Sequence, residues 1–101
     1  MELVGLVFAC TFEEGEPFYG VVCQVKGSEA KIRPLPCVVG RYNKKVLKCS
    51  PNWDKLERTI KTPGKFMWAR IVIEGKKPRL EAQGKTFELY GLEDEVHLFK
   101  A

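Results

Sequence analysis

Residues 18–33, FYGVVCQVKGSEAKIR, have the clearest pattern in the sequence, that of an amphipathic β-hairpin. Gly27-Ser28 suits a two-residue turn, since glycine supplies the positive φ that a type II′ turn requires. The predicted cross-strand pairs are Val25 with Ala30, Cys23 with Ile32, and Lys26 with Glu29. Apolar and polar side chains then alternate on both arms, which specifies the register of the hairpin.

The two ends of the chain differ in the clarity of their patterns. Residues 3–12 are almost continuously apolar, which predicts a central strand buried on both faces. Residues 92–100 fit two structures. The alternation of Val96 and Leu98 favours an edge strand, whereas a helix opened by acidic residues also fits.

Residues 37–49 have the pattern of a second hairpin. A turn centred on Asn43 would place Cys37 opposite Cys49. Directly opposed residues of antiparallel strands have Cα atoms about 4.5–5.5 Å apart, within reach of a disulfide. We therefore predict a Cys37–Cys49 disulfide, with buried thiols as the alternative.

Residues 65–90 predict a third hairpin with Lys76-Lys77 at its tip and a kink at Gly84 in the return strand. The pairs expected on the core face are Ile73 with Leu80, Ile71 with Ala82, and Met67 with Thr86. The pairs expected on the other face are Glu74 with Arg79, Val72 with Glu81, Arg70 with Gln83, Trp68 with Lys85, and Phe66 with Phe87.

One helix is expected, over residues 51–61. Ser50 is a good N-cap, and Pro51 suits the first helical position because its missing N–H is not needed there. Trp53, Leu56 and Ile60 would form one apolar stripe on this helix.

Composition excludes several classes of protein. The 101 residues suffice for a single domain, 1–101, with one core. No stretch approaches the ~20 apolar residues of a membrane span. No basic segment precedes an apolar run near the N-terminus, so we expect no secretory signal and a cytoplasmic protein. Twelve Lys and eleven Glu, against two Asn and two Gln, are typical of a thermophile.

Positive charge is concentrated in the middle of the chain. Residues 24–79 hold fifteen Lys and Arg against four acidic residues, whereas both ends are acidic. This block indicates an anionic partner. Alternatively, the acidic end strands lie beside the basic ones and neutralise them.

Catalysis and metal binding have little support in the sequence. His97 is the single histidine, and the four cysteines are 12 to 14 residues apart, with no close pair of the kind that zinc sites use. Phosphate-loop, dinucleotide and metalloprotease motifs are absent. We therefore expect no enzyme and no cofactor. A thiol-based or redox protein using Cys37 and Cys49, or a Cys–His pair with His97, is the remaining enzymatic hypothesis.

A basic and aromatic surface is the stronger candidate site. Arg and Lys neutralise phosphates, and an exposed aromatic ring stacks on bases. The predicted nucleic-acid contacts are Trp68, Arg70, Lys76, Lys77, Arg79 and Lys85 on the third hairpin, and Arg41, Tyr42, Lys44 and Lys45 on the second. In the alternative interpretation, Phe66, Trp68, Val72 and Phe87 form a second apolar face, covered by the 51–61 helix or by a partner.

The expected fold is mainly β: a small, partly open barrel of antiparallel hairpins, SH3-like or OB-like, with one short helix. A two-layer α+β sandwich is the alternative. The expected function is non-enzymatic binding of DNA or RNA, away from any membrane. The alternative is a protein–protein interaction subunit, such as a homodimer or part of a larger complex.

Overall fold

The structure is a computed structural model of the chain, and it describes residues 3–11, 17–42 and 46–90, with the side chains of 11, 39–42 and 46–49 left out. Eight strands and two short helical segments follow one another in this part of the chain. The strands are β1 (Val7–Thr11), β2 (Pro17–Lys26), β3 (Glu29–Pro34), β4 (Cys37–Tyr42), β5 (Val46–Pro51), β6 (Met67–Glu74), β7 (Lys77–Ala82) and β8 (Lys85–Tyr90). The helical segments are the 3-10 turn η1 (Trp53–Lys55) and the helix α1 (Leu56–Lys61).

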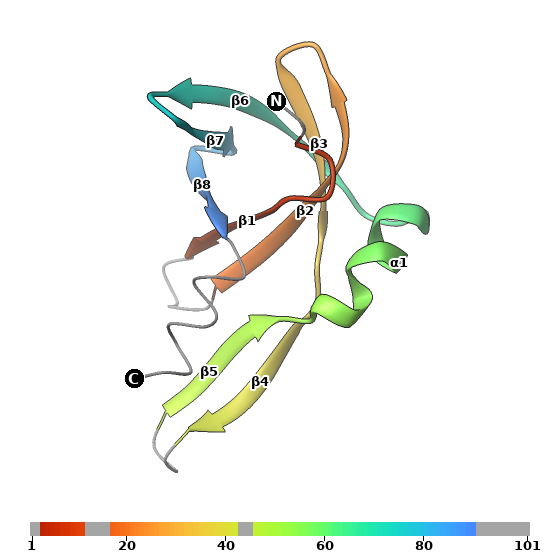
Figure 1. Ribbon diagram of the computed structural model, residues 1–101, viewed down its shortest axis with the longest axis vertical. Coiled ribbons are helices and arrows are strands. Elements are labelled where there is room, and N and C mark those ends of the chain that lie inside the picture. Colours follow the sequence, from red (N-terminus) through yellow and green to blue (C-terminus); the bar gives the residue numbers. More distant parts are fainter. Residues whose placement is uncertain (1–2, 12–16, 43–45, 91–101) are drawn as a thin grey trace.

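Six strands form a closed antiparallel barrel in the order β1-β2-β3-β6-β7-β8. Successive strands of the barrel pair with one another, β3 pairs with β6 across an insertion, and β1 closes the ring by pairing with β8, Phe8 opposite Leu89. The β4–β5 hairpin and α1 are inserted between β3 and β6, and the hairpin projects away from the barrel (Figure 1). The prediction of a small, mainly β barrel with one short helix is confirmed, and the barrel is closed rather than partly open. The α+β sandwich is therefore wrong.

The interior of the barrel is filled by alternate residues of every strand. Phe8, Ile32 and Leu80 are completely buried in it, and Phe87 is 2% exposed. The expectation that β1 is buried on both faces is confirmed, because Val7 on its outer face is also buried. Residues 3–6 precede the strand rather than extending it.

A second, smaller cluster lies outside the barrel beneath the helix. Val7, Tyr19, Val21 and Leu35 are its buried members, and the expected stripe of Trp53, Leu56 and Ile60 packs against them. The stripe is confirmed, but the predicted start of the helix is wrong. Ser50 and Pro51 end β5, and α1 begins only at Leu56.

The first hairpin confirms its predicted turn and corrects one pair. Val25 faces Ala30 and Lys26 faces Glu29, and Gly27 has a φ of 62°. A β-bulge between Val22 and Gln24 leaves Cys23 unpaired, so Ile32 faces Val22 instead of Cys23. A bulge changes which side chains of a strand face inward. Val22 is accordingly buried, whereas Val25 is exposed.

The third hairpin differs from its prediction by two residues. Its tip is Gly75-Lys76 rather than Lys76-Lys77, because Gly75 adopts the positive φ of 63°. The core pairing is consequently Ile71 with Leu80. A shift of two preserves which side of β6 and β7 faces inward, since side chains alternate with a period of two. In β8 the predicted inward residue, Thr86, is wrong, because Phe87 is buried and Thr86 is exposed.

The return strand of the third hairpin is not kinked at Gly84 but folds into two strands. Gln83 and Gly84, with φ values of 52° and 73°, form a two-residue turn that pairs Ala82 with Lys85. Two consecutive residues with positive φ are typical of a type I′ turn. This extra turn produces β8, and β8 closes the barrel.

The second hairpin exists, but its register also differs by two residues. Cys37 faces Pro51, and Cys49 faces Val39. Direct opposition of the two cysteines is therefore wrong. The predicted turn at Asn43 and the 92–100 tail lie outside the described residues.

Candidate functional site

Two aromatic rings and one lysine lie together on the outside of β3 and β6. Trp68 faces Lys31 across the strand pair. Phe66 immediately precedes β6, and the Lys31 Nζ lies 4.1 Å from the centroid of its ring. Phe66 is 50% exposed and Trp68 38% exposed. We call Lys31, Phe66 and Trp68 the aromatic–lysine patch.

The helix does not cover this patch. It packs on the cluster of Val7, Tyr19 and Val21, which belong to β1 and β2, and not on β6 (Figure 1). The interpretation of Phe66, Trp68, Val72 and Phe87 as one face under the helix is wrong. Phe87 lies inside the barrel, opposite Leu80, and not beside Phe66.

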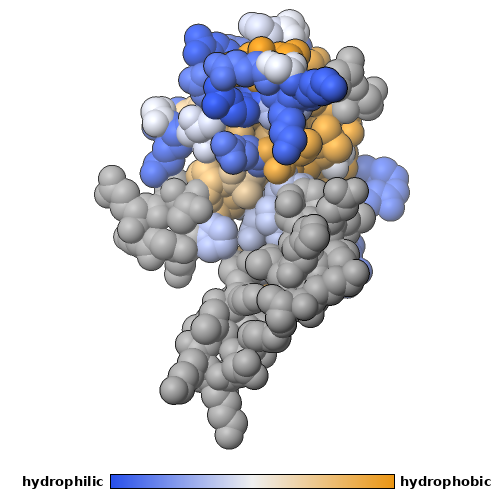
Figure 2. All heavy atoms as spheres, turned by 60° about the vertical axis from the view of Figure 1, so that its left-hand side comes forward, coloured by the Kyte–Doolittle hydropathy of each residue, from blue (hydrophilic) through white to orange (hydrophobic). Residues whose placement is uncertain are grey.

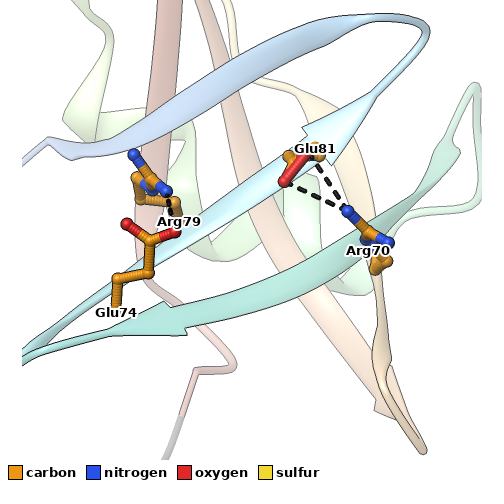
Figure 3. A network of polar contacts seen from close by, with 4 residues as sticks. All are labelled: Arg70, Glu74, Arg79 and Glu81. Atoms are coloured by element: carbon orange, nitrogen blue, oxygen red, sulfur yellow. Dashed lines mark hydrogen bonds and ion pairs between the residues drawn. The ribbon is translucent and has the colours of Figure 1, made fainter.

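The two arginines among the predicted contacts of the third hairpin, Arg70 and Arg79, are already engaged in ion pairs (Figure 3). Arg70 Nη2 lies 3.3 Å from each carboxylate oxygen of Glu81, and Arg79 Nη2 lies 2.8 Å from Glu74 Oε1. In the ladder, Arg70 also stands opposite Glu29, and Arg79 opposite Glu88. The positive charges of both arginines are therefore compensated by neighbouring carboxylates. Figure 2 shows hydrophilic and hydrophobic side chains interleaved over the same side of the barrel.

The predicted lysines are not all on the same face. Lys76 occupies the tip of the β6–β7 hairpin, and Lys77 pairs with Glu74. Lys85 pairs with Ala82 rather than Trp68. It is two residues from Phe87, so it shares the inward-facing side of β8, and its charge acts on Cys10 in the core.

The contacts predicted on the second hairpin fall on residues or side chains that the structure does not describe. Arg41 and Tyr42 end β4, but their side chains are not described. Lys44 and Lys45 lie outside the described residues. These four stay predictions.

The described cysteines give little support to thiol chemistry. Cys10 and Cys23 are free, whereas Cys37 is not a free thiol. Burial raises the pKa of Cys10 above its ordinary value and outweighs the opposing effect of the Lys85 charge. A thiol with a raised pKa is protonated and a poor nucleophile at neutral pH. Within the described part of the chain, no three potential ligands gather to hold a metal ion.

Sequence reasoning missed the part of Lys31 in the patch. Lys31 is 35 and 37 residues from Phe66 and Trp68, and only the β3–β6 pairing brings them together. Alternation along 29–33 did place Lys31 on the polar face of the first hairpin. Which strand would lie next to that face is not encoded locally.

The class that this geometry defines is a small closed antiparallel β-barrel carrying an exposed aromatic–lysine patch. No family model matches the chain, and no curated protein and no solved structure is significantly similar to it. Among the described helices, none is long and apolar enough to span a bilayer.

Proposed function

We propose that this is a non-enzymatic protein that binds DNA or RNA in single-stranded form on the aromatic–lysine patch. The observation that carries the proposal is the pair of half-exposed rings on the outer face of a β-barrel: Phe66, which lies under the Lys31 ammonium, and Trp68, which faces Lys31 across the strand pair. Exposed rings stack on unpaired bases, and the lysine neutralises a neighbouring phosphate. Small barrels use their sheet faces in this way.

The ion pairs divide the other predicted contacts into two groups. Lys76 is exposed at a hairpin tip and can supply a further phosphate contact. Lys44 and Lys45 stay predicted contacts. Arg70 and Arg79 must exchange a carboxylate for a phosphate before they contribute. We therefore expect stacking to supply more of the affinity than the arginines do.

The test is binding of a fluorescein-labelled single-stranded octanucleotide, followed by anisotropy in about 50 and 200 mM salt, where phosphate contacts depend steeply on salt. Trp68→Ala should weaken binding about tenfold, because stacking contributes about 1–3 kcal/mol per base and Trp68 has only part of its surface free. Ile73→Ala is the matched control, since Ile73 is a 61% exposed apolar residue of the same strand on the alternate face. Equal affinity of the two variants would contradict the site.

The second candidate function is a protein-interaction subunit, a homodimer or part of a larger complex. The same exposed rings favour it, because exposed aromatic residues are typical of interface centres. Light scattering distinguishes the two. A dimer whose Trp68 fluorescence is shielded supports the interaction subunit, and a monomer with quenchable Trp68 supports the nucleic-acid proposal.

Three finer features belong to this proposal. We propose a cytoplasmic location, because a nucleic-acid partner would be met there. The Lys and Glu enrichment supports a thermophilic source, for which we expect unfolding above about 90 °C. We also propose that Cys37 and Cys49 form a disulfide. The two cysteines lie on paired strands, two positions away from direct opposition, and Cys10 and Cys23 are free.

A further inference from the structure

A hollow of about 490 Å³ lies between the end of β3, the helix and residues 62–65, which lead to the aromatic–lysine patch. Four of its lining residues are basic, namely Arg33, Lys55, Arg58 and Lys65, and none is acidic. By contrast, the hollow at the other side of the barrel contains Lys77 and Arg79 together with Glu74 and Glu88. The first hollow therefore carries uncompensated positive charge.

Arg33 forms the rigid floor of this hollow. Its side chain is almost completely buried, at 7% exposure. Its Nη1 donates to the carbonyl oxygen of Thr59 at 3.0 Å, and its Nε donates to that of Lys65 at 3.5 Å. These two bonds fix the plane of the guanidinium. The missing side chain at Gly64 leaves space beside Nη2, because a Cβ there would lie only 3.0 Å from it.

The buried charge of Arg33 has no counter-ion within the described residues. The three described ion pairs join other residues, and the carbonyl groups that Arg33 contacts carry only partial charges. A buried charge without an ionic partner is expensive, and proteins normally pair such groups. An anion in the hollow would supply the missing charge.

Capping the helix explains part of this arrangement. The Thr59 carbonyl lies in the last turn of α1, where a cation is favourable. Capping does not explain why three further cations, Lys55, Arg58 and Lys65, border the same space while no acidic residue lines it. Glu57, on the same helix, pairs instead with Lys61 and does not line the hollow.

We infer that this hollow binds a phosphate group. Arginine suits this ligand because its planar fork of donors matches phosphate oxygens. Nη2 of Arg33 would donate from the floor, the three flexible cations would close around the group, and the Thr59 and Thr62 hydroxyls are additional donors. The volume lies within the range of about 300–1,000 Å³ found for small-molecule sites, so the group can belong to a diphosphate or a nucleotide.

The inference is tested with inorganic pyrophosphate, titrated into the full chain by calorimetry in about 50 mM salt. Arg58→Gln and Lys65→Gln should each weaken binding about tenfold, the value of one charge-assisted hydrogen bond. Both residues are exposed, so the barrel should fold normally in the variants. Lys61→Gln is the control, because it removes one charge from the same helix without touching the hollow.

Two results would overturn the inference. One is the absence of saturable 1:1 binding in the wild-type protein. The other is an equal loss of pyrophosphate affinity in Lys61→Gln and Arg58→Gln, which would show that pyrophosphate is attracted by the overall charge of the protein rather than bound at a site. The inference does not depend on the proposed nucleic-acid function, and Trp68→Ala should leave pyrophosphate binding unchanged.

A second arm identifies the source of the phosphate. Octathymidylate with a 5′-phosphate is compared with the same strand bearing a 5′-hydroxyl. Tighter binding of the phosphorylated strand, lost in Arg58→Gln, supports the hollow as the site of a strand terminus. Equal binding of both strands, with pyrophosphate still bound, supports it as the site of a small phosphate compound.

Discussion

Because Arg70 is paired with Glu81, we predict that removing the negative charge of Glu81 improves nucleic-acid binding. Glu81→Gln keeps the size of the side chain and removes its charge. Arg70, two residues from Trp68 on the same outer face of β6, is then released for a phosphate. We expect tighter binding and a steeper dependence on salt.

The size of the effect follows from the geometry of the pair. Both Glu81 oxygens lie 3.3 Å from Arg70 Nη2, and the two side chains are 67% and 39% exposed. Exposed pairs of this kind contribute about 0–1 kcal/mol, so release of Arg70 should raise affinity by up to about fivefold. One additional phosphate contact should also steepen the log–log salt slope by about 0.7 for a single strand.

The assay is octanucleotide anisotropy across about 50–200 mM salt. Glu57→Gln is the matched control, since it changes the net charge equally and releases Lys61, which lies neither in the patch nor in the hollow. Glu81→Gln should bind the octanucleotide more tightly than Glu57→Gln does, and its log–log salt slope should be steeper. The double variant Glu81→Gln with Arg70→Gln should lose the gain.

Equal gains in Glu81→Gln and Glu57→Gln would contradict a specific role of Arg70, because the effect would then reflect net charge alone. An unchanged slope in Glu81→Gln would show that Arg70 does not reach the strand. Either result would confine the interface to residues other than Arg70.

Further predictions concern the scaffold. Phe8→Ala should lower the free energy of unfolding by about 3–5 kcal/mol in urea, because Phe8 is completely buried, whereas Leu89→Ala, at a 37% exposed position opposite it, should cost much less. Similar losses would contradict the described core. Gln83→Asn should raise stability by about 0.5–1 kcal/mol, since asparagine tolerates the positive φ of 52° better than glutamine does; an unchanged urea midpoint would contradict this account of the turn. Thiol titration of the protein, denatured without reductant, should detect two thiols, and four after reduction, if Cys37 and Cys49 are joined; four at the outset would disprove the disulfide.

The elements that sequence predicted correctly are those with a local cause. Gly27-Ser28 forms its turn because glycine tolerates positive φ, and that property does not depend on distant residues. The continuous apolar stretch around Val7 and Phe8 predicted burial on both faces, because only a covered strand can carry it. The stripe of Trp53, Leu56 and Ile60 likewise found a hydrophobic surface.

The errors arose where several turns were locally acceptable. Both Gly75-Lys76 and Lys76-Lys77 could close the third hairpin, and both keep the same residues inward, so alternation alone did not distinguish them. The bulge at Cys23 inserts one residue into an otherwise regular pattern, and nothing in the adjoining residues signals it. Gly84 indicated a break, but whether it bends a strand or ends it depended on the closure of the barrel through β8.

The candidate sites depended most on tertiary structure. Local pattern was enough to predict a small β domain, its apolar interior and a basic central segment. Only the fold decided that Arg70 and Arg79 meet carboxylates, that Lys31 joins Phe66 and Trp68, and that Arg33 lies buried among three other cations. The physical reason is range: turn geometry and alternation act between near neighbours, whereas charge compensation depends on whichever strands the closed barrel places side by side.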